Sequence, residues 1–199
     1  MRNLVRQLLF LIFLIPVLPL VMLCRAGFGF QGCSQLMSLV PGWIGKQVRK
    51  PFYHLTLDSA SRQCHIDFGT FFPTPKVSIG QNVYIGAYCI ISKATIGDDV
   101  LIGSNVHLLG KGTHDFSCPD IPIRLQGGHS EPVTIGEDSW IGNGAIIMAH
   151  VGRKCVIGAG SLVTKDIPDY AIAVGNPARI IRMRTPAQSA GIIRGEQYV

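Results

Sequence analysis

A six-residue repeat is the feature that most constrains how this 199-residue chain can fold. An aliphatic residue recurs before a small one, and the pairs are Ile79-Gly80, Ile85-Gly86, Ile91-Ser92, Ile96-Gly97, Ile102-Gly103, Ile135-Gly136, Ile141-Gly142, Val151-Gly152 and Ile157-Gly158. This period is typical of a solenoid in which three short strands form each triangular coil, aliphatic side chains stack between coils, and glycine permits tight corners. The pattern therefore predicts an all-β fold, with just under four coils in residues 76–108 and 133–166.

Compact residues stand four positions after each aliphatic one, and Cys89 and Cys155 are two of them. We interpret both cysteines as small core residues. The six cysteines contain no C-x-x-C pair, so the sequence signals neither a zinc knuckle nor a disulfide framework. This cysteine usage is typical of a reduced, cytoplasmic protein.

Composition excludes a disordered chain, because 47% of the residues are hydrophobic and only 15% are charged. The basic excess is confined to the N-terminal third, where residues 1–62 contain seven Lys or Arg residues and one acid, Asp58. Acidic and basic residues balance in the remainder. This distribution favours a membrane surface as the target of the basic segment and argues against nucleic-acid binding by the main domain.

Residues 8–24 form an uncharged apolar run with Arg2 and Arg6 before it and Arg25 after it. As a helix the run would be about 26 Å long, short of the roughly 30 Å hydrocarbon core, and Pro16 and Pro19 would kink it. A spanning helix, a re-entrant or interfacial anchor and a cleaved signal peptide remain open. The short length, the prolines and the basic flanks favour the second of these.

Residues 34–57 carry apolar side chains at mixed three- to five-residue spacing, interrupted by Pro41 and Pro51. We expect short amphipathic helices here. Lys46, Arg49 and Lys50 lie close to Trp43 in sequence, as in an interfacial continuation of the anchor. Helices that simply pack on the main domain are an equally good interpretation.

The six-residue period is lost over residues 109–132, which are rich in Gly, Pro and His. An excursion of this length is usually functional or disordered. The flanking sequences VTIGEDSWIGNGAIIM and VIGAGSLVTKDIPDYAIAVGNPARIIR, together with the repeats, resemble the hexapeptide-repeat acetyltransferases of the galactoside, maltose and polysaccharide O-acetyltransferase branch. The resemblance covers roughly residues 77–184, and it implies a left-handed parallel β-helix that forms a homotrimer.

The resemblance implies that His114, in Gly112-Thr113-His114-Asp115, is the catalytic base. A neutral imidazole suits the removal of a proton from an acceptor hydroxyl near pH 7. The same resemblance implies an acetyl-CoA groove and direct transfer without an acyl-enzyme or a metal. The residues that match this groove are Trp140, Asn143, Ala159, Thr164, Lys165, Arg179 and Arg182.

Two departures from the family pattern affect the acceptor side. The family's acceptor-site asparagine aligns with Gly86, and the usual Pro-Gly-Val-Thr stretch is shortened to Ala149-His150-Val151-Gly152. We expect His150 to be a surface residue. The acceptor is therefore predicted only as a sugar, with a lipid-linked or envelope polysaccharide intermediate suggested by the N-terminal anchor.

Alternatives remain at the level of activity. An amino-sugar N-acetyltransferase would use the same base and groove, and a non-catalytic membrane-held scaffold would use neither. A zinc enzyme of the carbonic anhydrase type is a weaker alternative, because His107, His114, His129 and His150 lack the expected spacing.

The sequence predicts three regions: a membrane-associating helical region over 1–60, a β-helix acetyltransferase domain over 61–184 and a C-terminal tail over 185–199. Because acetyl-CoA is cytosolic, we expect the catalytic domain at the cytoplasmic face of a membrane.

Overall fold

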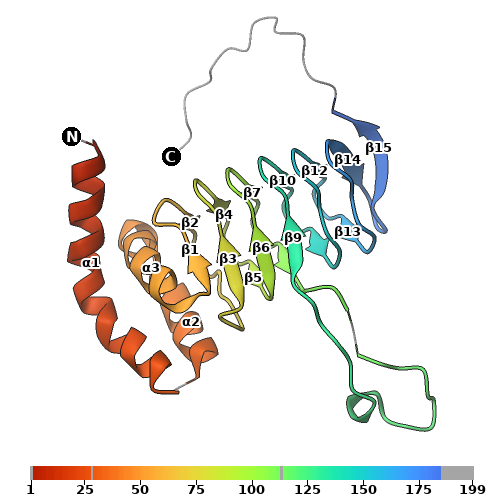
Figure 1. Ribbon diagram of the computed structural model, residues 1–199, viewed down its shortest axis with the longest axis horizontal. Coiled ribbons are helices and arrows are strands. Elements are labelled where there is room, and N and C mark those ends of the chain that lie inside the picture. Colours follow the sequence, from red (N-terminus) through yellow and green to blue (C-terminus); the bar gives the residue numbers. More distant parts are fainter. Residues whose placement is uncertain (1, 28, 113, 185–199) are drawn as a thin grey trace, which may run out of the picture.

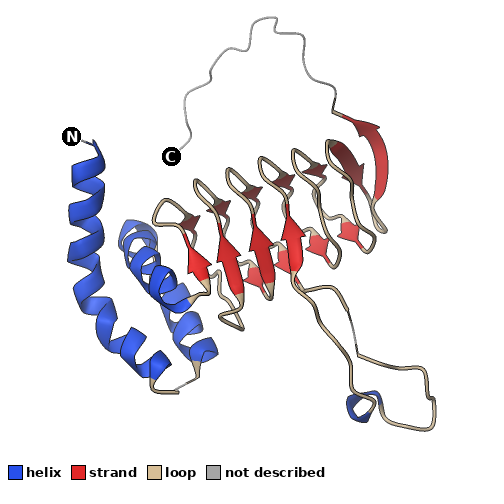
Figure 2. Cartoon of the chain, viewed as in Figure 1, coloured by secondary structure: helices blue, strands red, loops and turns tan. Residues whose placement is uncertain are grey.

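The structure is a computed structural model that describes residues 2–27, 29–112 and 114–184. Three helices at the N-terminus cover one end of a β-helix, and the last described strand, β15, lies at the opposite end of the stack (Figure 1). Strands and turns alternate regularly along the β-helix, as Figure 2 shows. The predicted tail over 185–199 lies outside the described residues.

The β-helix has three faces, each a sheet whose strands come from successive coils. The first face contains β1 (Ser59–Ala60), β3 (Val77–Ile79), β6 (Ala94–Ile96) and β9 (Val133–Ile135). The second contains β2 (His65–Ile66), β4 (Tyr84–Ile85), β7 (Leu101–Ile102), β10 (Trp140–Ile141), β12 (Val156–Ile157), β14 (Ala171–Val174) and the antiparallel β15 (Arg179–Met183). The third contains β5 (Ile90–Ile91), β8 (His107–Leu108), β11 (Ile146–Ile147) and β13 (Leu162–Val163).

The parallel strands of the second face define six coils, which we number 1 to 6 from the N-terminus. The stack is therefore longer than the just under four coils that the repeat predicts. Coil 1 carries Ala60, Ile66 and Phe72 as inward residues, and coil 6 carries Ala171 and Ala173. Coil 1 has no aliphatic-glycine pair, and in coil 6 the position in register with Ile157 is Ala173, which no glycine follows. The count from the repeat therefore misses both ends of the β-helix.

Inward side chains stack in ladders from coil to coil. On the second face Ile66, Ile85, Ile102, Ile141 and Ile157 are in register, and each is 0–2% exposed. Burial of such aliphatic side chains contributes about 25 cal/mol for each Å² removed from water. The ladders therefore provide most of the apolar stabilisation of the β-helix.

The glycines of the repeat allow successive coils to approach closely; they do not adopt unusual backbone dihedral angles. A Cβ at Gly142 would lie 2.5 Å from the amide nitrogen of Ala159, and one at Gly86 would lie 2.7 Å from the carbonyl carbon of Gly103. The left-handed conformation falls instead on neighbouring corner residues, for example Asn105 at φ 57°. The expectation that the repeat glycines permit tight corner conformations is thus corrected, since their missing side chain makes room for the next coil.

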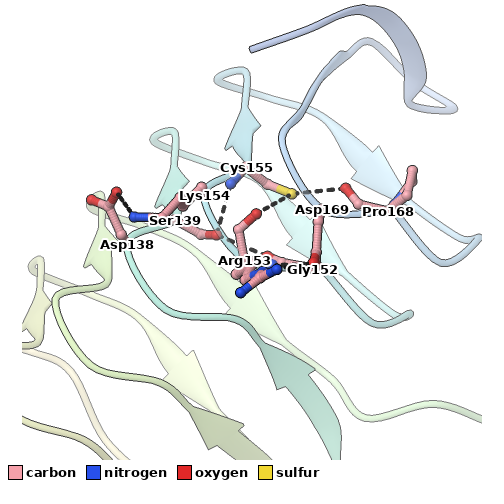
Figure 3. A network of polar contacts seen from close by, with 8 residues as sticks. All are labelled: Asp138, Ser139, Gly152, Arg153, Lys154, Cys155, Pro168 and Asp169. Atoms are coloured by element: carbon pink, nitrogen blue, oxygen red, sulfur yellow. Dashed lines mark hydrogen bonds and ion pairs between the residues drawn. The ribbon is translucent and has the colours of Figure 1, made fainter. Parts of the chain in front are cut away.

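Cys155 is a fully buried core residue, as predicted, and so is Cys89. The backbone N–H of Cys155 donates to Ser139 Oγ at 2.9 Å, and that hydroxyl donates to the carbonyl oxygen of Gly152 at 2.9 Å (Figure 3). Burial raises the pKa of the Cys155 thiol above its ordinary value. The thiol therefore stays protonated and belongs to the packing of the coils.

Ion pairs link successive coils at the corner between the first and second faces. Lys154 Nζ lies 3.1 Å from Asp138 Oδ2, and Arg153 Nε lies 2.8 Å from Asp169 Oδ2 (Figure 3). All four side chains are substantially exposed, so solvent screens both pairs and they add little to stability.

The helices α1 (Arg2–Arg25), α2 (Phe30–Ser38) and α3 (Gly42–Thr56) form a helical cap over coil 1. Pro16 and Pro19 lie inside α1, which bends along its length (Figure 1). The amphipathic helices expected in residues 34–57 are present, but Pro51 lies inside α3 instead of interrupting it. Phe52 and Tyr53 beside it are fully buried, and this packing offsets the hydrogen bond that proline removes.

The segment Gln7–Arg25 has a mean hydropathy of 2.6 and by length and composition alone could cross a membrane. Only 11% of it is buried within the protein.

Candidate active site

Residues 109–132 leave the β-helix after β8 and return at β9 as a projecting segment, which we call the arm (Figure 1). Its two legs are joined by backbone bridges between Lys111 and Glu131 and between His114 and Gly128. The Lys111 N–H donates to the Glu131 carbonyl at 2.8 Å, and the reverse bond is 2.7 Å long. The arm is therefore a narrow two-legged structure whose neck closes at the β-helix.

Side chains of the β-helix hold the neck in place. Lys111 Nζ forms an ion pair with Asp166 Oδ2 at 3.1 Å, and Lys93 Nζ donates to the carbonyl oxygen of Ser130 at 2.9 Å. The His150 N–H donates to Asp166 Oδ1 at 3.0 Å. This backbone hydrogen bond, with the Lys111 ammonium, holds the pKa of Asp166 below its usual range.

His150 lies at the neck and is half-buried. Its Nδ1 accepts a hydrogen bond from the Thr134 N–H at 3.1 Å. Nδ1 is therefore unprotonated in this arrangement, and any proton on the neutral ring is on Nε2.

Gln126 holds the tip of the arm, which includes the 3₁₀ helix η1 (Ile123–Leu125). Its side-chain amide accepts from the Cys118 N–H at 3.0 Å and donates to the carbonyl oxygens of Cys118 at 2.8 Å and Ile121 at 2.6 Å. Apolar side chains on the arm nevertheless remain exposed, namely Phe116, Ile121, Ile123 and Leu125.

His114 lies on the outgoing leg of the arm, and its side chain is exposed. Asp115 beside it is also exposed, and its N–H donates to the Gly127 carbonyl at 3.2 Å. Thr113 lies outside the described residues.

The residues predicted for the coenzyme groove fall into three places. Asn143 and Ala159 occupy the same corner, between the second and third faces, in coils 4 and 5, where the Gly160 N–H donates to the Asn143 carbonyl at 2.8 Å. Thr164 and Lys165 follow β13 and adjoin Asp166 at the neck of the arm. All four side chains are exposed.

Trp140 on β10 and Arg182 on the antiparallel edge strand β15 face the same hollow of the second face, with β12 and β14 between their strands. They line an open hollow of about 340 Å³, which also includes Asp99, Leu101, Asp138, Ser139, Val156, Ile172 and Arg184. Arg179 lies at the start of β15 and is exposed. The hollow combines an aromatic ring with guanidinium groups, which can stack on a planar group and pair with an anion.

The seven predicted groove residues thus lie in three separate places on the β-helix, whereas His114 lies on the arm. Sequence reasoning did not identify Lys111, Asp166 or Gln126 as parts of the site. The Lys111–Asp166 pair joins residues 55 positions apart, so no local motif signals it.

Within residues 2–27, 29–112 and 114–184, no group of three or more His, Cys, Asp or Glu side chains is arranged to hold a metal ion.

The coils, the arm and the C-terminal hairpin define the class of hexapeptide-repeat β-helix proteins. Residues 76–110 match the family model described as bacterial transferase hexapeptide (six repeats), and residues 132–165 match that of the hexapeptide repeat of succinyl-transferase. The maltose O-acetyltransferase structure from Clostridium difficile 630 superposes with a TM-score of 0.68 at 27% identity, covering 79% of this chain and 87% of that one.

Sequence relatives place the chain within a family. A Staphylococcus aureus (strain MRSA252) protein named "Putative acetyltransferase SAR2635" is 35% identical over 141 residues, which cover 69% of this chain and 68% of that one. The galactoside O-acetyltransferase of Escherichia coli (strain K12) is 42% identical over 114 residues, which cover 53% of each chain. The match therefore spans about half of that enzyme. The chain belongs to the hexapeptide-repeat acetyltransferase family, as its sequence pattern predicted.

Proposed function

We propose that the protein transfers the acetyl group of acetyl-CoA to a sugar hydroxyl, with His114 as the general base. The observation that carries the proposal is the arm: it positions an exposed imidazole on a braced loop at the margin of a β-helix whose relatives include galactoside and maltose O-acetyltransferases. A scaffold protein would need no such bracing around a histidine.

The reaction is a direct displacement at the thioester. The acceptor oxygen attacks the acetyl carbonyl carbon while His114 removes the hydroxyl proton, so a C–O bond forms as the C–S bond breaks. The proton then passes from the imidazolium to the departing thiolate, and coenzyme A leaves as the thiol. The exposed position of His114 gives an acceptor access to its ring.

The donor contacts follow from the chemistry of coenzyme A. Lys165, Arg179 and Arg182 carry the cations that suit its phosphates. The corner at Asn143 and Ala159 presents small side chains and backbone groups, which suit the narrow pantetheine arm. Trp140 adds an apolar surface on the second face.

The separation of His114 from these residues favours a site completed between chains. A homotrimer in which the arm of one subunit lies beside the groove of the next would bring base and donor together. The exposed apolar side chains of the arm would be covered in the same step.

The acceptor is proposed as a lipid-linked or envelope polysaccharide intermediate, with the enzyme at the cytoplasmic face of a membrane. The support is the apolar N-terminal segment, since an enzyme for free sugars needs no such segment. Gly86 in place of the family's acceptor-site asparagine is consistent with an acceptor other than a simple galactoside.

The test measures thiol release from acetyl-CoA by the wild-type protein and by His114→Ala, with free and lipid-linked sugars as acceptors. We expect His114→Ala to lower kcat by roughly 10²- to 10⁴-fold while the dissociation constant of coenzyme A stays within about twofold, because a base acts in the transition state. His107→Ala, a change of a half-buried histidine on β8, is the matched control and should retain activity. Full activity of His114→Ala, or failure of the wild-type protein to bind coenzyme A, would contradict the proposal.

A further inference from the structure

Helix α1 has two apolar faces, and only one of them is covered. On the covered face Val17 and Val21 are each 2% exposed, Phe10 packs edge-to-face on His54, and Phe13 packs edge-to-face on Trp43. The opposite face carries Leu8, Leu11, Ile12, Ile15, Leu18 and Met22, which are 42–71% exposed. Their spacing of three and four residues places them in one continuous stripe along the helix.

The exposed stripe extends onto the rest of the helical cap. Leu36 and Leu39 at the end of α2, and Trp43 and Ile44 at the start of α3, are 56–64% exposed. Trp43 adjoins α1 through its contact with Phe13. We call these residues and the stripe the outer face. Exposed apolar side chains gathered in this number on one end of a protein mark an interaction site.

Contacts with the rest of the protein indicate that α1 stays packed on α3 when another surface covers the outer face. The buried side of α1 packs along α3, and Arg25 Nη2 donates to the Leu55 carbonyl at 3.4 Å. The Arg62 guanidinium stacks on the Phe10 ring at 4.6 Å. A helix that crossed a bilayer would have to leave α3 and expose the apolar side chains that it now covers.

Either a second copy of the chain or a lipid surface could cover the outer face, and charge distinguishes between them. Residues 1–62 contain seven Lys or Arg residues and a single acid. Arg49 is buried, whereas Arg25 and Arg62, which contact Leu55 and Phe10 where α1 packs on the rest of the protein, are exposed. A second copy of the chain would present the same positive charge and be repelled. Anionic lipid headgroups would be attracted.

We propose that the helical cap docks on an anionic membrane surface, with α1 lying flat in one leaflet and the outer face buried among the lipids. Trp43 then sits at the interface, where amphipathic rings are favoured. The membrane holds the protein without being crossed by it.

This docking determines the orientation of the β-helix axis relative to the membrane. The layers follow one another as α1, α3 and coil 1, and α1 runs across the end of the β-helix (Figure 1). The coils therefore rise from the membrane, and the arm leaves after coil 3. With about 4.8 Å between strands and about 10 Å for a helical layer, the neck of the arm lies roughly 25 Å above the lipid surface.

This height restricts the acceptor, provided that His114 is the base as proposed above. A single sugar attached to a lipid phosphate would lie at the membrane surface, well below the arm. The site instead suits a membrane-linked glycan several sugars long, whose outer residues reach the arm.

The docking is tested by flotation of the full-length protein with vesicles, without acetyl-CoA, so the result is independent of catalysis. We expect flotation with phosphatidylcholine vesicles that contain about one third phosphatidylglycerol, and weaker flotation at 1 M salt. Ile12→Glu should reduce binding at least tenfold. Ile181→Glu is the matched control, because Ile181 is 61% exposed on β15 and Ile12 is 59% exposed, and it should float like the wild type.

Equal flotation of Ile12→Glu and the wild type would overturn the proposal. So would a wild-type protein that does not float, or an Ile12→Glu variant that changes only the oligomeric state, since a second copy would then be the occupant.

The two tryptophans of the chain measure the orientation. In Trp140→Phe the remaining Trp43 should be quenched by brominated lipids, whereas in Trp43→Phe the remaining Trp140, on coil 4, should not be. A protease added outside sealed vesicles should remove an N-terminal tag completely, because α1 does not cross the bilayer. Quenching of Trp140 or a protected tag would overturn the flat arrangement.

Acceptor length is tested separately with the wild-type enzyme on vesicles. Turnover should rise steeply between a one-sugar and a multi-sugar lipid. Faster turnover of the one-sugar lipid would overturn the height argument and leave acetyl transfer itself intact, whereas no turnover of any acceptor would count against the proposed function.

Discussion

Arg49 joins the helical cap to the β-helix through backbone oxygens on both sides. Its Nε donates to the Ile66 carbonyl of coil 1 at 2.9 Å, and its Nη1 donates to the carbonyls of Val40 at 2.8 Å and Met37 at 3.3 Å. The side chain is fully buried, and burial lowers the pKa of its guanidinium. Gly45 leaves room for this arrangement, since a Cβ there would collide with the Val40 carbonyl and with Arg49.

We predict that Arg49→Met destabilises the protein by about 2–4 kcal/mol, because the buried carbonyl oxygen of Ile66 and the partly buried ones of Met37 and Val40 lose their donor. Urea unfolding followed by circular dichroism measures the change. Arg62→Met is the control: this side chain is exposed, so the expected cost is under about 1 kcal/mol. Equal effects of the two changes would mean that Arg49 contributes no more than a surface cation.

A second prediction concerns the repeat glycines. Gly142→Ala should destabilise by about 1–3 kcal/mol, because its Cβ would press on the backbone of coil 5. Gly32→Ala in α2, where a Cβ meets nothing within 4 Å, should be neutral or stabilising by up to about 1 kcal/mol. Thermal unfolding of both variants checks the contrast, and a neutral Gly142→Ala would show that the coils can separate at little cost.

At this scale the repeat predicted which residues are inward but not why glycine recurs. The inward aliphatic residues and Cys89 follow from the period alone. The close approach at Gly142 depends on a residue 17 positions away, and the role of Arg49 depends on carbonyls that lie 9, 12 and 17 positions away. Such contacts leave no local pattern.

Among the elements, the arm is the one whose position matters most for the proposed chemistry. Lys111 and Asp166 pair at its neck, and both side chains are about half exposed, so the pair contributes under about 1 kcal/mol to global stability. Its role is to restrict the legs of the arm near His114.

We predict that Lys111→Met lowers kcat about three- to tenfold with little change in coenzyme affinity, since a displaced base costs rate more than binding. Protease cleavage within the arm should become faster. Lys76→Met, a change of an exposed lysine near coil 2, is the control for loss of one positive charge. An arm cleaved at the wild-type rate would mean that the ion pair does not brace it.

Acidity should loosen the same contact. The pKa of Asp166 is lowered in the folded protein by the His150 N–H and by Lys111. The stabilisation of the neck by this carboxylate is therefore complete above the ordinary pKa of an aspartate, about 3.9. It is lost as the pH falls through the lowered pKa. The protection factors of the amides at the neck, which correct for the pH dependence of the intrinsic exchange rate, should therefore stay constant from pH 7 to about pH 5 and fall only below about pH 4.

The solenoid was predictable at the element scale because one inward aliphatic residue per strand repeats. Its two end coils were not, since Ala60, Phe72, Ala171 and Ala173 fill inward positions without the aliphatic-glycine pair. The excursion was predictable as a segment, whereas its bridged legs were not, because they depend on pairing between residues such as Lys111 and Glu131.

For the whole molecule, the separation of His114 from the groove residues makes subunit mixing informative. His114→Ala and Ala159→Trp, which fills the corner beside Asn143, should each be inactive alone. In a trimer with sites between subunits, random mixed trimers should regain about a quarter of the wild-type sites. The measurement is thiol release after the two variants are dissociated and reassembled together, with each variant reassembled alone as the control. No recovered activity would place each complete site within one chain.

The narrow neck of the arm has a consequence for how this protein can change. Coil stacking continues across the insertion, with the Leu109 N–H bonded to the Ile147 carbonyl at 3.0 Å and the Val133 N–H bonded to the Lys93 carbonyl at 3.1 Å. The coils thus fold as if the arm were absent, and excision of residues 112–130 should leave the melting temperature almost unchanged while abolishing turnover. The proposed chemistry depends on the arm, and the stability of the fold depends on the coils. Substitutions in the arm could therefore adapt the protein to a new acceptor without destabilising the β-helix.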